Sequence, residues 1–266
     1  MAIDGETRLM GVIGDPVAQV RTPQVINPLF ATGGANIICV PMRIRAEDLE
    51  AAVAGLRGIE SVVGFGVTLP HKEPITALCD SLDPAAATVG AANVVRREAD
   101  GSFRGYQFDG RGFVGGLKAA GLDPSGRDCL VVGAGGAARA IVHALLDTGA
   151  RCVGVANRTR AKAEALVAAA NATNGDSRAR VVPAEPAPGQ LVVNATSLGL
   201  SPGDPLPLDP HLIDATMTVA DVIAHPEHTA FLIEAAARGA RTHSGIHMIT
   251  HQVGLIADHM MELYGP

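Results

Sequence analysis

The sequence predicts an α/β fold in which helices cover parallel sheets, and two observations support this prediction. Short apolar runs alternate along the chain with amphipathic stretches, which is the pattern of parallel strands joined by crossover helices. Ala, Val and Leu abound, aromatic residues make up only 3% and Trp is absent, as is usual where strands are buried on both faces. With 266 residues the chain can form one large domain or two modest ones.

The first alternating set occupies the N-terminal part of the chain. Its predicted strands are Leu9–Ile13, Ile37–Met42, Val62–Thr68, Asn93–Arg97 and Phe103–Gln107, the last two flanking the hairpin turn Asp100-Gly101. A helix is expected at Thr22-Pro23, because Thr22 suits the N-cap and proline suits the first helical position. Pro28 is expected to shorten or kink that helix. A second helix, Glu47–Leu56, carries apolar residues on one face.

The second set begins after Asp109-Gly110. Its predicted helices are Phe113–Ala120, Ala137–Thr148, Thr159–Ala170, Thr229–Arg238 and Ile246–Leu263, and its predicted strands are Cys129–Val132, Arg151–Ala156, Leu191–Asn194 and Thr218–Asp221. Gly121 and Gly149 stand where a helix commonly ends in a left-handed residue. The segment Ala172–Gly189 is expected to be mostly loop around a short strand near Val181.

Composition and charge exclude several classes of protein. The 47% hydrophobic and 18% charged content differs from that of disordered chains. The net charge of −6, with no basic run, argues against a nucleic-acid partner. No apolar stretch reaches membrane-spanning length, and Asp4 and Glu6 stand where a signal peptide would be basic, so a cytoplasmic location is expected. The four cysteines are far apart and are expected to be reduced.

A glycine-rich loop between a predicted strand and a predicted helix indicates a dinucleotide site. Gly133, Gly135 and Ala138 fit the pattern in which the first glycine makes the turn, the second admits a pyrophosphate and the third small residue keeps the helix near the sheet. The phosphates would lie at the helix N-terminus, beside Gly136 and Ala137.

The end of the next strand predicts NADP rather than NAD. An NAD site places a carboxylate there for the ribose hydroxyl, whereas this chain has Asn157, Arg158 and Thr159. Arg158 and Lys162 supply positive charge for a 2′-phosphate, and Thr159 adds a hydroxyl. The competing interpretation is a solvated basic helix start, which the unfavourable placement of cations at a helix N-terminus disfavours.

Eight motifs in order resemble the shikimate dehydrogenase family. They are Gly14-Asp15-Pro16 with Thr22-Pro23, Val67-Thr68-Leu69-Pro70-His71-Lys72, Gly90-Ala91-Ala92-Asn93, Asp109-Gly110-Arg111-Gly112, Gly133–Ala138, Asn157-Arg158-Thr159, Asn194-Ala195-Thr196-Ser197-Leu198-Gly199, and Gly245-Ile246-His247-Met248 with Gln252. The resemblance spans nearly the whole chain.

The resemblance implies two domains and a set of site residues. Residues 1–109 would form the substrate-binding catalytic domain, residues 110–243 the Rossmann domain, and the helix within 244–266 would return to the first domain. It further implies that Lys72 and Asp109 are catalytic, that Thr22, Thr68, Asn93 and Gln252 bind substrate, and that Thr196 joins the cofactor residues. A lysine with a neighbouring carboxylate can exchange the hydroxyl proton that accompanies hydride transfer. Asp109 alone would also suit a helix N-cap.

The chain departs from the family pattern in its substrate half. Val20, Gly66, Val94, Phe108 and Ile223 stand where the family usually has a hydroxyl residue, Asn, Thr, Thr and Tyr. A lost hydrogen bond to a charged group is worth about 1.5–3 kcal/mol, so several such losses predict an altered substrate. Arg21 and Arg111 are candidates to replace the missing carboxylate contacts.

Other functions fit the sequence less well or stay open beside this interpretation. His247 and His251 have a spacing that can bind zinc, with His243 one turn earlier, but no H-E-x-x-H pattern accompanies them and no metal site is predicted. The chain lacks a nucleophile-elbow pattern, which argues against a hydrolase. The remaining hypotheses are an NADP-dependent oxidoreductase acting on a shikimate- or quinate-like hydroxy acid, true shikimate activity at reduced efficiency, or a non-catalytic dinucleotide or metabolite sensor. Monomer and homodimer both stay open.

Overall fold

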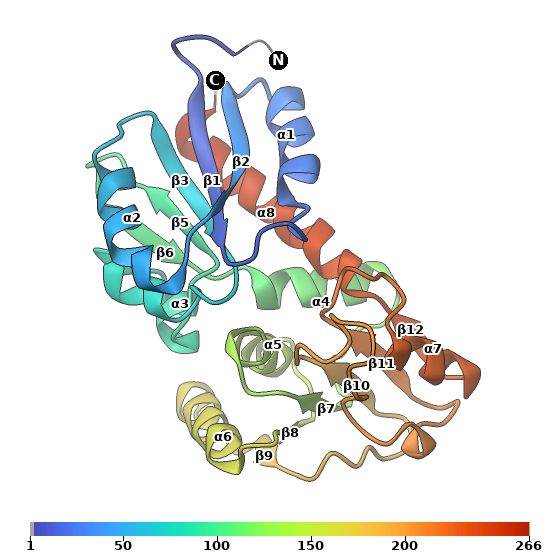
Figure 1. The fold of residues 1–266 in the computed structure, drawn as a ribbon. Helices are drawn as coiled ribbons and strands as arrows, with labels where there is room; N and C mark the ends of the chain where they lie inside the picture. Colours follow the sequence, from blue (N-terminus) through green and yellow to red (C-terminus); the bar gives the residue numbers. More distant parts are fainter. Residues whose placement is uncertain (1–2, 266) are drawn as a thin grey trace. The chain divides into compact units, whose positions relative to one another are not determined.

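The computed structural model describes residues 3–265, which divide into two units, each built on a six-stranded sheet (Figure 1). Unit 1 comprises the described residues up to Phe108 together with those from Gln252 onward, and unit 2 comprises Asp109–His251. The two sheets with their helices confirm the α/β prediction.

Unit 1 is a mixed sheet with the strand order β2-β1-β3-β5-β6-β4. Its strands are β1 Arg8–Gly14, β2 Ile37–Arg43, β3 Val62–Val67, β4 Ser81–Leu82, β5 Val94–Arg97 and β6 Phe103–Tyr106. Its helices are α1 Thr22–Thr32, α2 Leu49–Arg57 and α3 Pro84–Val89, with 3₁₀ segments at Ala46–Asp48 and Pro74–Leu78. β1 pairs in parallel with both β2 and β3, whereas β5 and β6 form the predicted antiparallel hairpin.

Two local predictions for unit 1 need correction, and one helix was not predicted. Arg21, not Thr22, is the N-cap of α1, and its side chain makes no capping bond. Pro28 does not shorten the helix, which continues to Thr32. The segment after Lys72 was not predicted to hold regular structure, yet Asp83 caps α3 by accepting a hydrogen bond from the Ala86 amide at 2.7 Å. Asp83 followed by proline is a sequence signal for a helix start.

Unit 2 is an all-parallel sheet with the strand order β12-β11-β10-β7-β8-β9. Its strands are β7 Asp128–Val132, β8 Cys152–Ala156, β9 Ala179–Val181, β10 Leu191–Asn194, β11 Thr218–Asp221 and β12 Arg241–His243. Its helices are α4 Asp109–Ala119, α5 Gly136–Asp147, α6 Arg160–Asn174 and α7 Ala230–Ala237, with a 3₁₀ segment at Pro210–Leu212. The last helix, α8 Gly245–Tyr264, begins in unit 2 and ends in unit 1.

Most of the predicted elements of unit 2 are confirmed, with three differences. α4 begins at Asp109 rather than Phe113, α6 runs on to Asn174 into the expected loop, and the short strand β12 was not predicted. Gly121 and Gly149 follow their helices with positive φ, as expected of residues that end a helix.

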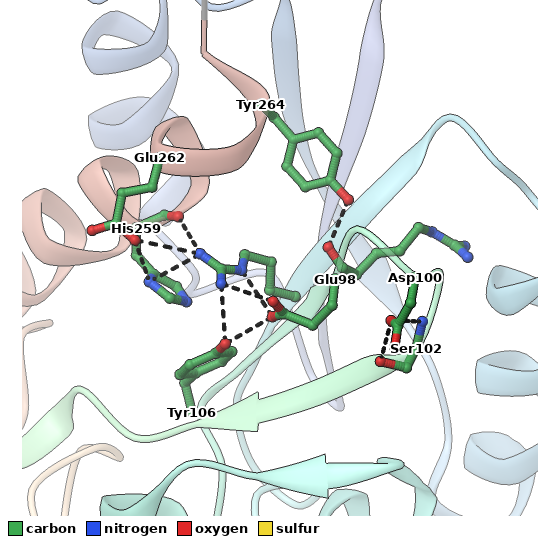
Figure 2. A network of polar contacts seen from close by, with 9 residues as sticks. Glu98, Asp100, Ser102, Tyr106, His259, Glu262 and Tyr264 are labelled. Atoms are coloured by element: carbon green, nitrogen blue, oxygen red, sulfur yellow. Dashed lines mark hydrogen bonds and ion pairs between the residues drawn. The ribbon is translucent and has the colours of Figure 1, made fainter.

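The C-terminal helix is tied to the sheet of unit 1 by a charged network (Figure 2). The Arg96 guanidinium donates to both Glu98 oxygens at 2.9 Å, to the Tyr106 hydroxyl at 3.2 Å and to the His259 carbonyl at 2.8 Å. The Tyr264 hydroxyl donates to the Arg97 carbonyl at 2.6 Å. These bonds join α8 to β5 and β6, because His259 and Tyr264 belong to the helix.

No helix among the described residues combines the length and the apolar content that crossing a bilayer requires.

Candidate functional site

Each sheet contains a point where the chain reverses the direction in which it adds strands. In unit 1 the chain passes from β1 outward to β2 and then to β3 on the other side of β1. In unit 2 it passes from β7 outward to β8 and β9 and then to β10 on the other side of β7. Ligands of open α/β sheets bind outside the carboxyl ends of the strands at such a switch point. Both edges are therefore candidate sites.

The switch point of unit 1 brings together the loops that follow β1 and β3. The Thr68 amide donates to the Ile13 carbonyl and the Asp15 amide donates to the Leu69 carbonyl, both at 2.9 Å. Gly14 is required at this crossing because a side chain on it would collide with the Thr68 methyl. The predicted substrate residues Thr22 and Thr68 follow these two strands, and both are half-buried.

Lys72 lies on the same edge, between a backbone hydrogen bond of its own and a side-chain hydrogen bond of its neighbour. Its carbonyl accepts from the Ala92 amide at 2.8 Å. Next to it, the fully buried His71 ring makes a 2.7 Å hydrogen bond through Nε2 to the Ile44 carbonyl. The Lys72 side chain is half-buried. His71 belongs to the motif around Lys72 but was not predicted as a site residue, because its partner Ile44 lies 27 residues away in the sequence.

Asn93 links the edge of unit 1 to the segment that leads into unit 2. It is 3% exposed, and its Oδ1 accepts from the Phe108 amide at 2.8 Å. Its backbone carbonyl accepts from the Val67 amide at 2.7 Å. Gln252, the fourth predicted substrate residue, lies on α8 and is half-buried.

Asp109 is the first residue of α4 in unit 2 and is 1% exposed. The next residue, Gly110, lets α4 approach α5 closely, because a side chain there would collide with the Ala140 carbonyl. This contact fixes the start of α4 and therefore the backbone that carries Asp109. The Asp-Gly pair thus has a packing reason as well as a chemical one.

The switch point of unit 2 carries the predicted glycine turn. Gly133 has φ +123°, a conformation that favours glycine, and a Cβ on it would come within 2.7 Å of the Ala195 carbonyl. Gly135 is exposed, and a Cβ on it would meet no atom within 4 Å. Ala138 is fully buried against the sheet. The loop therefore leaves open space at the N-terminus of α5, where unpaired helix amides attract phosphate.

The end of β8 differs from an NAD site in the way the sequence predicted. No carboxylate stands there, and Asn157 uses its side-chain amide to donate to the Thr159 carbonyl at 2.9 Å. Arg160 pairs with Glu164 at 2.7 Å. Within residues 3–265, neither Arg158 nor Lys162 has a side-chain hydrogen bond or ion pair, and both are exposed. Two cations without such partners on either side of a helix start suit a phosphate ligand.

Thr196 follows β10 and is held by Asn194, which begins the same sequence motif but was given no role of its own. Asn194 is fully buried, and its Oδ1 accepts from the Thr196 hydroxyl at 2.7 Å and from the Thr196 amide at 3.1 Å. Its Nδ2 donates to the Leu198 carbonyl at 3.0 Å. The loop after β10 is thus folded around one buried amide side chain.

His243, which ends β12, packs against the histidines in the first turns of α8. The His243 and His247 rings stack with centroids 4.8 Å apart, and His251 Nδ1 lies 2.8 Å from the His247 carbonyl. Burial, together with the neighbouring His247 and His251, lowers the pKa of His243 to about 4. Within residues 3–265, no three His, Cys, Asp or Glu side chains gather as metal ligands would.

The residues that depart from the family pattern are mostly buried. Phe108 is 5% exposed and stacks on Tyr106, with the His259 ring 5.4 Å away. Val94 is fully buried and Val20 is half-buried. Ile223 is 4% exposed.

A cavity of about 290 Å³ in unit 1 lies away from these residues. It is lined by Arg8, Glu60, Val63, Arg97, Glu98, Ala99, Gly101, Leu263 and Tyr264. Arg8 begins β1, so the cavity opens at the amino edge of the strands, opposite the edge that carries Lys72.

Two comparisons by sequence agree with the arrangement. Residues 12–95 match the family described as shikimate dehydrogenase substrate binding domain, and residues 118–180 match the family described as shikimate / quinate 5-dehydrogenase. The chain is 45% identical over 241 residues to the shikimate dehydrogenase (NADP(+)) of Rubrobacter xylanophilus. The aligned region covers 89% of this chain and 84% of that relative.

Solved structures resemble the whole chain. The shikimate 5-dehydrogenase of Thermus thermophilus, in complex with NADP(H) and shikimate, has a TM-score of 0.86 and 33% identity, covering 98% of this chain and 95% of that one. The ligand-free 5-ketofructose reductase of a Gluconobacter strain has a TM-score of 0.82 and 30% identity, covering 97% and 92% of the two chains.

Proposed function

The chain belongs to the shikimate dehydrogenase family, and on that premise we propose that it is an NADP-dependent oxidoreductase acting on a CH–OH group. Hydride would move reversibly between the nicotinamide and a ring carbon of a shikimate- or quinate-like hydroxy acid. The observation that carries this proposal is the set of residues at the two switch points. In unit 1, Lys72 lies at the carboxyl edge of the sheet, and in unit 2 the Gly133 turn leaves open space beside it. Accordingly we assign the substrate to unit 1 and the dinucleotide to unit 2.

Lys72 and Asp109 are proposed as the acid–base pair. In the oxidative direction the alcohol loses a hydride from carbon and a proton from oxygen, and Lys72 Nζ accepts that proton. In the reductive direction the same nitrogen returns it. Asp109 is proposed as the carboxylate that takes part in this proton exchange. The fixed backbone of Lys72, bonded to Ala92, supports a positioned group rather than a mobile surface amine.

The residues of unit 2 fit NADP. When bound, the cofactor supplies the site that accepts or gives the hydride. Gly133, Gly135, Gly136 and Ala137 would hold the pyrophosphate, Asn157, Arg158, Thr159 and Lys162 the adenosine with its 2′-phosphate, and Thr196 the nicotinamide half. Arg158 and Lys162 support this choice because no described side chain neutralises them.

The substrate is proposed to differ from that of most of the family. Thr22, Thr68, Asn93 and Gln252 would bind it, as the family resemblance implies. The ring of Phe108 is buried against Tyr106 and His259 where a hydroxyl is usual, and Val20 and Val94 offer no hydrogen bond. The 5-ketofructose reductase, a similar structure, carries the name of a different substrate. We therefore propose a small polar hydroxy compound that needs fewer hydrogen bonds at these positions.

The test is the change in nicotinamide absorbance with a panel of shikimate, quinate and 5-ketofructose, each with the NADP and NAD forms of the cofactor. Turnover of at least one compound is expected, with NADP preferred. If shikimate is the best substrate by a wide margin, the altered-substrate part is wrong and the oxidoreductase remains. If NADP binds but nothing turns over, the non-catalytic sensor replaces the enzyme.

A further inference from the structure

Asp221 is a buried carboxylate at the carboxyl edge of unit 2 to which the mechanism gives no role. It ends β11 and is fully buried. Its Oδ2 accepts from Asn194 Nδ2 at 3.1 Å and from the Thr229 hydroxyl at 2.8 Å, and its Oδ1 accepts from the Ile223 amide at 2.9 Å. Burial raises the pKa of Asp221, and these hydrogen bonds oppose that rise. A buried carboxylate with this many donors needs a reason.

The donors come from three segments that meet at this edge. Asn194 holds the loop of Thr196 and Leu198 after β10, as described above. Ile223 lies in the loop after β11, and Thr229 caps α7 by accepting from the Leu232 amide. One side chain therefore joins the two loops and the start of α7.

The glycines of these segments pack closely against the loop after β11 and the start of α7. Gly199, with φ +109°, would place a Cβ 3.3 Å from the Ile223 side chain and 3.5 Å from Thr229. Gly245, which begins α8, would place a Cβ 2.5 Å from the Ile223 carbonyl. If the loops separated, this close packing would be lost together with the Asp221 bonds.

We propose that Asp221 is a positioning residue for the nicotinamide half of the cofactor site, acting through Asn194 and the Thr196 loop. The inference rests on the proposed function. The sheet order β10-β7-β8 explains why we expect the effect in only one half of the cofactor site. This order puts the Thr196 loop on one side of the Gly133 turn and Arg158 on the other. Asp221 supports the β10 side alone. Removing it disturbs the nicotinamide half and leaves the binding of the 2′-phosphate half intact.

The primary variant is Asp221→Asn, which keeps the shape and replaces one acceptor by a donor. In either orientation of the new amide, its N–H groups face the Asn194 amide or the Ile223 amide, so one buried donor loses its acceptor. Such a loss costs enough to weaken NADP binding or turnover by about fivefold or more. The matched control is Thr218→Val, at the other end of the same strand. Thr218 is 3% exposed and accepts from Arg127 at 3.0 Å, so its loss destabilises β11 without reaching the loops.

Affinities for NADP and for adenosine 2′,5′-bisphosphate, which lacks the nicotinamide, would be measured together with kcat and KM. For Asp221→Asn we expect weaker NADP binding or lower kcat with unchanged bisphosphate affinity. For Thr218→Val we expect wild-type affinities and kinetics despite a lower unfolding temperature. Equal effects of Asp221→Asn on both ligands, or kinetics matching the Thr218→Val control, would overturn the positioning role. If the wild type neither binds NADP nor turns over any substrate, the proposed function fails instead.

A second pair of variants keeps the test decisive if Asp221→Asn does not fold. Thr229→Ser retains the hydroxyl that donates to Asp221 and caps α7, whereas Thr229→Val removes both bonds. The serine variant is expected to match the wild type. The valine variant is expected to lose NADP affinity or kcat while keeping bisphosphate affinity, and wild-type behaviour of the valine variant would contradict the proposal.

Discussion

The two units use one topological device with different residues. In each sheet the chain reverses at a switch point, and in each a glycine crosses close to a neighbouring loop, Gly14 against Thr68 and Gly133 against Ala195. Unit 2 leaves space beside Gly135, whereas unit 1 places Lys72 at its edge. The comparison teaches that strand order selects where a ligand binds and that a few side chains decide which ligand it is.

The buried polar groups of the two units also differ. Unit 1 joins its sheet to α8 through Arg96, which forms an ion pair with Glu98 and donates to the His259 carbonyl of the helix, away from the edge that carries Lys72. Unit 2 places one buried carboxylate, Asp221, directly at the carboxyl edge with neutral donors around it. We therefore expect the polar network of unit 2, and not that of unit 1, to affect the cofactor.

The largest expected effect is a loss of kcat from a substitution in unit 1. Lys72→Ala removes the proposed proton acceptor and should lower kcat by about 10²–10⁴-fold while NADP affinity hardly changes. Lys118→Ala, at an exposed lysine of α4, is the control and should leave kcat unchanged. Steady-state kinetics and an NADP titration measure the two quantities. A folded Lys72→Ala protein with near-normal turnover would remove Lys72 from the mechanism.

The next effect concerns the stability of unit 2. The pKa of His243 is lowered to about 4 from an ordinary 6.5, so between these values the unfolded chain binds more protons than the folded one. Stability should be complete above pH 6.5 and decline as the pH falls towards 4, by up to about 3 kcal/mol. His243→Leu should flatten this dependence, whereas His211→Leu, at an exposed histidine, should not. Unfolding by urea across this range measures it, and identical slopes for both variants would contradict the assignment.

A smaller effect should separate the two cofactors. Arg158→Ala should weaken NADP by about tenfold and affect NAD little, because the lost contact is with the 2′-phosphate alone. Arg160→Ala is the matched control, since Arg160 already pairs with Glu164. Isothermal titration with both cofactors measures the difference. If the wild type binds NAD and NADP equally, the assignment of the 2′-phosphate site is wrong.

The smallest expected effect is a gain in kcat/KM for shikimate from a substitution in unit 1. Val20→Ser restores a hydroxyl in the half-buried loop before Thr22 and should raise kcat/KM for shikimate about fivefold, the value of one modest hydrogen bond. Val17→Ser in the same loop should give no gain. Kinetics on shikimate and on the best panel substrate make the comparison. A fall in kcat/KM for shikimate would show that the valine itself contacts this substrate.

Much of the fold was readable from the sequence because its signals are local. The apolar runs of β1, β3, β7 and β10 and the glycines after α4 and α5 depend only on neighbouring residues. The segment holding α3 and β4 was missed although Asp83-Pro84 marks a helix start. Helix α1 continues through Pro28 to Thr32, which the local rule for proline did not anticipate.

The candidate site could be predicted where a sequence motif marks its residues. It could not be predicted where only a tertiary contact brings the residues together. The turn at Gly133 and the cations at Arg158 and Lys162 follow from sequence spacing. Asp221 and Asn194 are 27 residues apart, and only the pairing of β10 with β11 brings their side chains together. His71 likewise reaches Ile44 across the sheet of unit 1. Such tertiary partners have no local signature.

Hydride transfer itself is the most direct test of the central claim. NADPH carrying deuterium at the transferable position of its nicotinamide ring would be incubated with the ketone form of the best panel substrate, and the product analysed by NMR. The account predicts deuterium on the ring carbon that gains the hydroxyl, with the label lost from the cofactor in equal amount. Reduced product without deuterium on that carbon, or tight NADPH binding with no reduction of any ketone, would contradict it.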